Sequence, residues 1–253
     1  MQLTVLGSGA ACPPAGKNSS GILISEQERT ILLDCGHGVA SATLAIHPDF
    51  DIDDIFISHM HADHFIDVLA LRFRVTRAME GIAGTPPRTT LHLPPGGIDV
   101  LAKILNALTF PSDFCENTFN VREYDPGKTE WYGPIQVRFS PAEHYIPSWA
   151  IRIEGKTTVT YSGDTAPCDL IRDFARGSDR FICEATLKEP EYGLVRGHCT
   201  ATQAAQMAED SKVNKLLLTH FWYGTNLEEV RKEAASIYSG PLVIAEDGTH
   251  IEI

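Results

Sequence analysis

Three imidazoles and one carboxylate lie within six consecutive residues, His59-Met60-His61-Ala62-Asp63-His64. The segment directly follows Ile55-Phe56-Ile57, an apolar run typical of a buried strand. Because side chains two residues apart in an extended segment face the same side, His59 and His61 can bind one cation together. Asp63 and His64 fall at the turn into the next helix, where they can bind a second cation. Imidazole and carboxylate are the ligands expected for Zn²⁺, with Mn²⁺ and Fe as alternatives.

A pair of metal ions needs further ligands, and three predicted strands end just before residues that can supply them. These strands, over 135–139, 157–161 and 216–219, are followed by His144, Asp164 and His220. In open α/β sheets, functional groups gather where strands end. We therefore expect Asp164 to bridge two metal ions, one bound by His59, His61 and His144 and the other by Asp63, His64 and His220. The cations outweigh the two carboxylates and a bridging hydroxide, so the site would attract an anion.

Single histidines carry less information than this cluster. Alone, His144 or His220 would more often be an ordinary hydrogen-bonded side chain, and the motif at 59–64 is what favours a ligand role. The remaining histidines without such placement are predicted to be structural or surface residues: His37, His47, His92 and His250.

Strands and helices must alternate to position these residues. The apolar patterns predict strands over 3–6, 21–24, 30–33, 55–58, 90–93, 135–139, 150–154, 157–161, 181–183, 216–219 and 242–245. They predict helices over 39–46, 65–77, 100–108, 169–175, 201–211 and 227–239. Residues 85–97, rich in proline and glycine, are predicted to form an irregular edge rather than a linker. We expect one domain over residues 1–253.

Composition narrows the class of partner. The chain has 253 residues, of which 43% are hydrophobic, which is enough for a substantial core. Its net charge of −12 rules out a global attraction to nucleic acid or to an anionic membrane. The six cysteines include no CxxC pair and are expected to be reduced, buried thiols. Without a basic leader or an apolar stretch of about 20 residues, the protein is predicted to be cytoplasmic, with no membrane partner.

The motif at 59–64, followed by Asp164 and His220, resembles the metallo-β-lactamase superfamily along nearly the whole chain. Several further motifs are similar to the ribonuclease Z branch, which cleaves tRNA precursors: Tyr161-Ser162-Gly163-Asp164-Thr165, Glu184-Ala185-Thr186, Gly197-His198-Cys199-Thr200 with Gln203-Ala204-Ala205, and Leu218-Thr219-His220-Phe221. This resemblance implies an α/β fold with four layers, an αβ/βα sandwich of mixed sheets with helices on the outer faces. It also implies two zinc ions and hydrolysis by a metal-bound hydroxide.

The resemblance assigns roles to individual residues. It implies the seven metal ligands already argued from spacing, and Asp63 is also the expected proton acceptor. His198 matches the family's catalytic histidine that is not a metal ligand, and Glu184 is placed in sequence to orient it. The alternative for His198 is an ordinary residue at a helix N-terminus, next to the capping residue Thr200.

One departure from the ribonuclease Z pattern concerns the substrate. Those proteins carry a long arm, rich in glycine and proline, that clamps tRNA, whereas here only Glu154-Gly155-Lys156 joins two predicted strands. Armless members are similar to cyclic-nucleotide phosphodiesterases. Two other branches are disfavoured by ligand identity. β-Lactamases commonly have cysteine where Asp164 stands, and di-iron oxygen reductases commonly have glutamate where His61 stands.

These observations predict a dinuclear metal-dependent phosphodiesterase that acts on a small-molecule or single-stranded phosphodiester. The first alternative is a ribonuclease Z-type endonuclease that processes tRNA 3′ ends, with the arm supplied by a homodimer partner. The second is a non-catalytic metal-binding scaffold, which predicts damaged ligands or a missing His198. Every expected position is intact in this chain.

Overall fold

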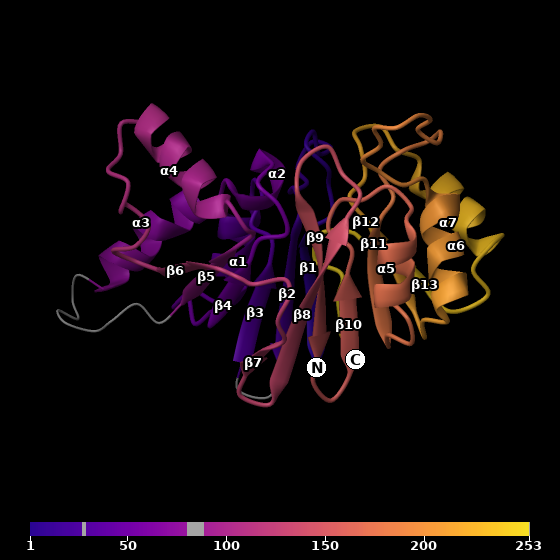
Figure 1. Cartoon of the computed structure of the whole chain (residues 1–253), viewed down its shortest axis with the longest axis horizontal. Helices are drawn as coiled ribbons and strands as arrows, with labels where there is room; N and C mark the ends of the chain where they lie inside the picture. Colours follow the sequence, from indigo (N-terminus) through magenta and orange to yellow (C-terminus); the bar gives the residue numbers. More distant parts are fainter. Residues whose placement is uncertain (27–28, 80–88, 253) are drawn as a thin grey trace.

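The structure is a computed structural model that describes residues 1–26, 29–79 and 89–252. Two sheets lie against each other in the middle of the molecule, with helices beyond each of them (Figure 1). Both sheets are mixed: strands pair antiparallel in one half and parallel in the other. This arrangement brings the carboxyl ends of parallel strands from both sheets to one edge of the molecule.

The first sheet holds seven strands of the described chain, in the order β14-β1-β2-β3-β4-β5-β6. In chain order they are β1 (Gln2–Gly7), β2 (Gly21–Glu26), β3 (Arg29–Leu33), β4 (Asp54–Phe56), β5 (Thr90–Leu93), β6 (Asn120–Glu123) and β14 (His250–Glu252). Its helices are α1 (Val39–Ile46), α2 (Ala62–Phe65), α3 (Val68–Met79) and α4 (Gly97–Ala107).

The second sheet follows the order β13-β12-β11-β10-β9-β8-β7, again with seven described strands. They are β7 (Glu130–Tyr132), β8 (Ile135–Ala142), β9 (Ser148–Glu154), β10 (Thr158–Tyr161), β11 (Arg180–Glu184), β12 (Leu216–Thr219) and β13 (Leu242–Ile244). Its helices are α5 (Asp169–Phe174), α6 (Ala201–Ser211) and α7 (Leu227–Ala235).

Three apolar clusters separate the four layers. One lies between the sheets and contains buried residues of both, such as Ile24 and Ile151. A second joins the first sheet to its helices, with Leu32 and Val68 among its members. The third packs the second sheet against its helices and is rich in small residues of α6, including Ala204 and Ala208. The predicted four-layer αβ/βα sandwich is thereby confirmed.

The prediction of one continuous helix over 65–77 is wrong. In the structure, α2 ends at Phe65 and a second helix, α3, begins at Val68. The break is caused by Asp67, whose N–H donates to the carbonyl of Cys35 (3.1 Å) instead of continuing the helix. The carboxylate of Asp67 accepts a hydrogen bond from the N–H of Ala40 at the start of α1 (3.0 Å). Tertiary contacts therefore override a helical sequence pattern here.

Other boundaries differ by a few residues. The strand predicted over 55–58 is β4 over 54–56, the helix predicted over 100–108 begins earlier as α4, and the helix predicted over 227–239 ends earlier as α7. The short strands β6, β7 and β14 were not predicted. Of the irregular edge predicted over 85–97, residues 85–88 lie outside the described part of the chain, and the rest contains β5 and the start of α4.

The predicted tight turn between β9 and β10 is confirmed. β9 ends at Glu154, β10 begins at Thr158, and the N–H of Gly155 donates to the carbonyl of Thr157 (3.1 Å). No arm extends between these strands. Among the helices in the described part of the chain, none is long and apolar enough to cross a membrane.

We expect Ile151→Ala to lower the free energy of unfolding by about 2–5 kcal/mol, because Ile151 is fully buried between the sheets and the truncation leaves a cavity. Urea unfolding followed by circular dichroism measures the change. Ile46→Ala is the matched control: Ile46 is 49% exposed at the end of α1, and we expect a loss below about 0.5 kcal/mol. Equal losses in the two variants would contradict the assigned core.

Candidate metal centre

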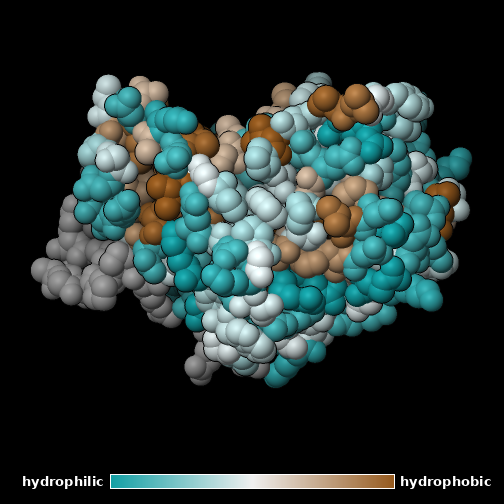
Figure 2. All heavy atoms as spheres, in the orientation of Figure 1, coloured by the Kyte–Doolittle hydropathy of each residue, from teal (hydrophilic) through white to brown (hydrophobic). Residues whose placement is uncertain are grey.

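The sequence-predicted ligands meet at the edge where strands of both sheets end. The motif at 59–64 follows β4 of the first sheet, and the other three residues follow strands of the second sheet: His144 after β8, Asp164 after β10 and His220 after β12. This upper edge of the molecule is hollowed beside α4, and hydrophobic residues lie on both sides of the hollow on an otherwise mostly hydrophilic face (Figure 2).

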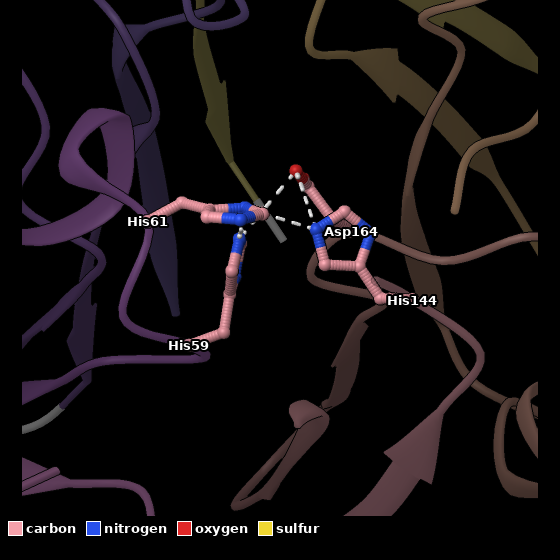
Figure 3. Close-up of side chains that lie close together, drawn as sticks. All are labelled: His59, His61, His144 and Asp164. Carbon is pink, nitrogen blue, oxygen red and sulfur yellow. Dashed lines mark hydrogen bonds and ion pairs between the residues drawn. The ribbon is translucent and has the colours of Figure 1, made fainter. Parts of the chain in front are cut away.

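A first group of four side chains converges around Asp164 (Figure 3). The Nδ1 atom of His61 lies 3.0 Å from Nε2 of His59 and 3.0 Å from Nε2 of His144. Oδ2 of Asp164 lies 3.6 Å from Nε2 of His59 and 3.9 Å from Nε2 of His144. All four offered atoms are within 4.8 Å of one another, so this group can hold one metal ion.

A second group shares Asp164 and is completed by three residues. Nε2 of His64 and Nε2 of His220 are 3.2 Å apart. Oδ2 of Asp63 lies 3.5 Å from the first of these atoms and 3.4 Å from the second. Oδ2 of Asp164 lies 3.3 Å from Nε2 of His64, and Oδ1 lies 3.4 Å from Nε2 of His220. This group can hold a second metal ion next to the first.

Two observations indicate that these side chains can hold divalent cations. Ligands bound at about 2.0–2.1 Å to a tetrahedral Zn²⁺ lie about 3.3 Å apart, close to the separations within both groups. In addition, Oδ1 of Asp164 is buried and accepts no hydrogen bond from any described residue. A buried carboxylate oxygen without a donor is costly unless a cation lies beside it.

Four histidines are held from behind through the ring nitrogen that faces away from the cluster. Nδ1 of His59 is 3.0 Å from Oγ of Ser58, Nδ1 of His144 is 2.7 Å from the carbonyl of Gly197, and Nδ1 of His220 is 2.7 Å from Oγ1 of Thr186. Nδ1 of His64 is 2.7 Å from Asp34. Proton donation from Nδ1 to these acceptors leaves Nε2 with a free lone pair aimed into the cluster.

Asp34 is a buried residue that contacts the predicted ligands and that the sequence pattern did not reveal. Its carboxylate is fully buried and accepts hydrogen bonds from His64, from the hydroxyl of Tyr161 (2.7 Å), and from both the N–H (2.7 Å) and the hydroxyl (2.8 Å) of Ser58. Its φ of 58° lies in the left-handed region, as does the φ of 63° at His220. The sequence feature that could have indicated Asp34 is its position directly after β3, at the same sheet edge as the predicted ligands.

At five of the predicted ligands, burial and charge favour the protonation state that binds a cation. Burial lowers the pKa values of His59, His61 and His144, which favours the neutral imidazole. Burial raises the pKa of Asp63 and of Asp164, but neighbouring histidines outweigh it and hold both values well below the usual range. Because ligands must be deprotonated to bind a cation, these five side chains are ready to do so. At His64, burial lowers the pKa, but the carboxylates of Asp164 and Asp34 outweigh it and raise the pKa.

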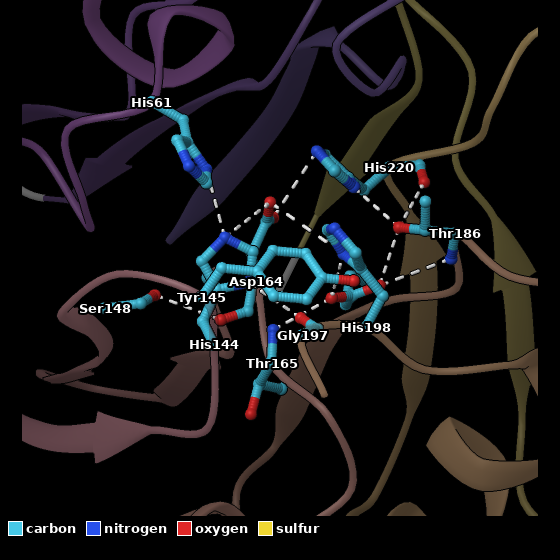
Figure 4. Close-up of polar contacts among 12 residues, drawn as sticks. His61, His144, Tyr145, Ser148, Asp164, Thr165, Thr186, Gly197, His198 and His220 are labelled. Carbon is cyan, nitrogen blue, oxygen red and sulfur yellow. Dashed lines mark hydrogen bonds and ion pairs between the residues drawn. The ribbon is translucent and has the colours of Figure 1, made fainter. Parts of the chain in front are cut away.

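His198 lies at the edge of the cluster, near Thr186 and His220 (Figure 4), and its hydrogen-bond partner is Glu184. The ligand atoms of Glu184, His198 and His220 also lie within 4.8 Å of one another. Nδ1 of His198 lies 2.8 Å from Oε1 of Glu184. Burial lowers the pKa of His198, but the hydrogen bond to Glu184 and the nearby carboxylates outweigh burial and raise the pKa to about 9. The prediction that Glu184 could orient His198 thus finds a direct contact, which leaves Nε2 of the imidazole for other partners.

Glu184 is itself fixed by several donors and is 1% exposed. It accepts hydrogen bonds from the N–H groups of Thr165 (2.8 Å) and Cys199 (3.2 Å), and from the hydroxyl of Thr186 (2.6 Å). That hydroxyl also contacts His220, so Glu184 connects the metal ligands with His198.

The histidines predicted to be structural or surface residues lie outside these groups. His92 is buried, bonded to Asp54 (2.8 Å) and stacked on Phe56. His47 pairs with Asp51 and His250 with Thr4, and His37 is exposed. None of the four belongs to a potential metal-binding group among the described residues.

Comparison with known proteins agrees with this site. A family model described as "Beta-lactamase superfamily domain" matches residues 29–221. "Probable metallo-hydrolase YhfI" of Bacillus subtilis is 28% identical over 249 residues, covering 98% of both chains. Its crystal structure covers all of this chain and 99% of its own, with a TM-score of 0.86 and 26% identity.

Two further relatives differ in their described activities. "Ribonuclease Z" of Haloferax volcanii is 23% identical over 309 aligned positions, covering 100% of this chain and 95% of its own. A structure described as a new diphosphatase from the PhnP family has a TM-score of 0.80 at 18% identity, covering 100% of this chain and 97% of the other, which shows a shared fold. The chain belongs to the β-lactamase superfamily, and the prediction of a metal-dependent hydrolase is confirmed.

Proposed function

We propose that this protein is a dinuclear phosphodiesterase, with Zn²⁺ as its metal, that hydrolyses a small or single-stranded phosphodiester. The observation that carries the proposal is the pair of four-ligand groups that share Asp164 and lie beside the His198–Glu184 pair. Two adjacent cations are suited to a phosphodiester because they act on both the attacking and the leaving oxygen. Both sheets contribute ligands, so residues 1–253 are proposed to act as one domain.

Each side chain has a stated part in the proposal. His59, His61 and His144 hold one cation, Asp63, His64 and His220 hold the other, and Asp164 lies between them. When bound, the cations supply hydroxide from water near neutral pH and offset the negative charge of the phosphodiester.

Asp63 and His198 are proposed to move protons. Asp63 takes up the proton released by the attacking water and passes it on to solvent, because its side chain is 12% exposed whereas that of Asp164 is 3% exposed. The lowered pKa of Asp63 means that it does not keep the proton. His198 gives a proton to the leaving oxygen as the phosphorus–oxygen bond breaks. Its raised pKa keeps the imidazole protonated at neutral pH, and Glu184 fixes the ring through Nδ1.

A ribonuclease Z-type activity on tRNA is the second candidate, and the sequence relatives with that name favour it. The tight turn at 154–157 and the net charge of −12 weigh against a large polyanion. The residues proposed for hydrolysis all come from one chain, so the mechanism does not require a homodimer. A cytoplasmic location stays a prediction.

We expect Asp164→Ala to lose metal as well as activity, because the variant removes the ligand common to both groups. Metal affinity should fall by more than about 100-fold, beyond the usual effect of losing an outer partner of a ligand. Metal content after dialysis and hydrolysis of bis(p-nitrophenyl) phosphate measure both. Asp173→Ala, on the exposed surface of α5, serves as control. Full metal occupancy in Asp164→Ala would contradict the bridging role.

We expect Asp34→Asn to weaken metal binding by about 10- to 100-fold without direct contact to the metal. The amide cannot accept all four hydrogen bonds, so His64 and Ser58 lose their orientation. Competition with a chelator measures the affinity, and circular dichroism checks folding. Tyr161→Phe removes one of the four donors and should have a smaller effect. An unchanged affinity in a folded Asp34→Asn protein would remove Asp34 from the site.

We expect His198→Ala to keep both metal ions and to lower kcat by about 10²- to 10⁴-fold, the usual contribution of a general acid. Metal analysis and steady-state kinetics on bis(p-nitrophenyl) phosphate test this separation. His250→Ala is the matched control, since His250 is exposed on β14. If His198→Ala retains wild-type kcat with unchanged metal content, His198 has no part in the mechanism.

A further inference from the structure

A cavity of 620 Å³ opens next to the proposed catalytic pair. Its lining includes Tyr145, Thr186 and His198, which also belong to the surroundings of the metal ligands. Its opposite side is formed by the turn after β12 and by α7, with Trp222, Tyr223 and Glu233 among the lining residues. The cavity therefore adjoins the cluster of predicted metal ligands.

Three large aromatic side chains line this cavity although they are partly open to solvent. Tyr145 is 47% exposed, Trp222 is 48% exposed and Tyr223 is 66% exposed. Large aromatic side chains gain free energy when they are buried, so several of them around one hollow mark a surface that binds a partner. Their flat faces favour a ligand that is flat and aromatic itself.

The backbone holds these aromatic residues in place before any ligand binds. Phe221 is buried, and its N–H and carbonyl bond to Ser8 and Ala10 of the first sheet's loop. The next residues form a turn closed by the N–H of Thr225 and the carbonyl of Trp222 (3.1 Å). A preformed wall reduces the ordering cost of binding.

Tyr145 forms the wall nearest to the metal ligands. Its hydroxyl donates to Glu191, and its ring lies against Gly197, where an added Cβ would approach ring atoms to 2.5 Å. The ring also packs against His144 and His198, at centroid distances of 4.9 Å and 5.5 Å. Glycine is needed at position 197 for this close approach.

His198 determines which part of a substrate enters the cavity. In the proposed reaction it protonates the leaving oxygen, and it also lines the cavity. The group attached to the leaving oxygen therefore extends toward Trp222 and Tyr223. The charged side chains of the lining are Lys188, Glu229 and Glu233, and their excess of negative charge disfavours a leaving group that is itself anionic.

We propose that this cavity binds the leaving group of the substrate and that the leaving group is a nucleoside, whose base stacks on Trp222 and Tyr223. A nucleoside is flat and aromatic at one end, carries no charge, and is linked to phosphate through its sugar. The cavity lies within the usual size range of small-molecule sites and takes one nucleoside rather than a folded RNA. This inference rests on the proposed phosphodiesterase function and specifies its substrate class.

The test compares thymidylyl-thymidine, which has one phosphodiester and two bases, with an analogue of identical sugar and phosphate chemistry that lacks both bases. Because stacking of one base is worth about 1–3 kcal/mol, kcat/KM of the metal-loaded enzyme should be at least about 5-fold higher for the compound with bases. Trp222→Ala should remove most of this preference. Trp131→Ala, which truncates a 65% exposed tryptophan of β7 outside the cavity, should retain it.

The outcomes separate this inference from the proposed function. Equal kcat/KM for the two compounds, or an unchanged preference in Trp222→Ala, would overturn the nucleoside site. Hydrolysis of both diesters in that case would still support the phosphodiesterase. If neither diester is cleaved at full metal loading, the phosphodiesterase is overturned. Equilibrium dialysis with thymidine then tests the nucleoside site independently of hydrolysis. Saturable binding of thymidine that Trp222→Ala abolishes supports the site, and the absence of binding to the wild-type protein rejects it.

Discussion

The buried carboxylate of Asp34 connects the two sheets at the point where the metal centre forms. It extends from the end of β3 in the first sheet and accepts a hydrogen bond from the hydroxyl of Tyr161 of β10 in the second. It also holds His64 directly and His59 through Ser58. A buried carboxylate is costly unless each oxygen is satisfied, so these partners must all be in place together. The orientation of the metal ligands is thereby coupled to the packing of one sheet on the other.

A second buried carboxylate, Glu184, has the same role on the other side of the centre. It orients His198 directly and reaches His220 through Thr186. The two histidines are therefore aligned by one group, although only His220 is proposed to bind metal. The left-handed backbone at Asp34 and His220 costs free energy, which the surrounding hydrogen bonds and packing offset. The centre is rigid because its side chains are constrained from behind.

Relatives of this chain differ in aligned length. The alignment with Haloferax volcanii ribonuclease Z spans 309 positions, whereas this chain has 253 residues and matches YhfI over 249. In this chain the β9–β10 connection is only a turn, and the cavity beside His198 is built from the turn before α7 and from α7 itself. In the proposals made above, metal chemistry and substrate choice reside in separate segments, so one could change without the other.

The sequence by itself determined the metal motif and the alternation of strands and helices, because these depend on local spacing and hydrophobic periodicity. The four-layer sandwich followed from the resemblance of its motifs to a known family. It also singled out the residues that follow β8, β10 and β12, which the structure gathers into one cluster. Only the tertiary structure decided the place of Asp34, the break between α2 and α3, and the aromatic cavity. Each of these depends on contacts between residues distant in sequence, and no local pattern encodes which distant groups will meet. The edge strands β6 and β14 were missed for the same reason, since pairing with a neighbouring strand rather than their own apolar pattern makes them strands.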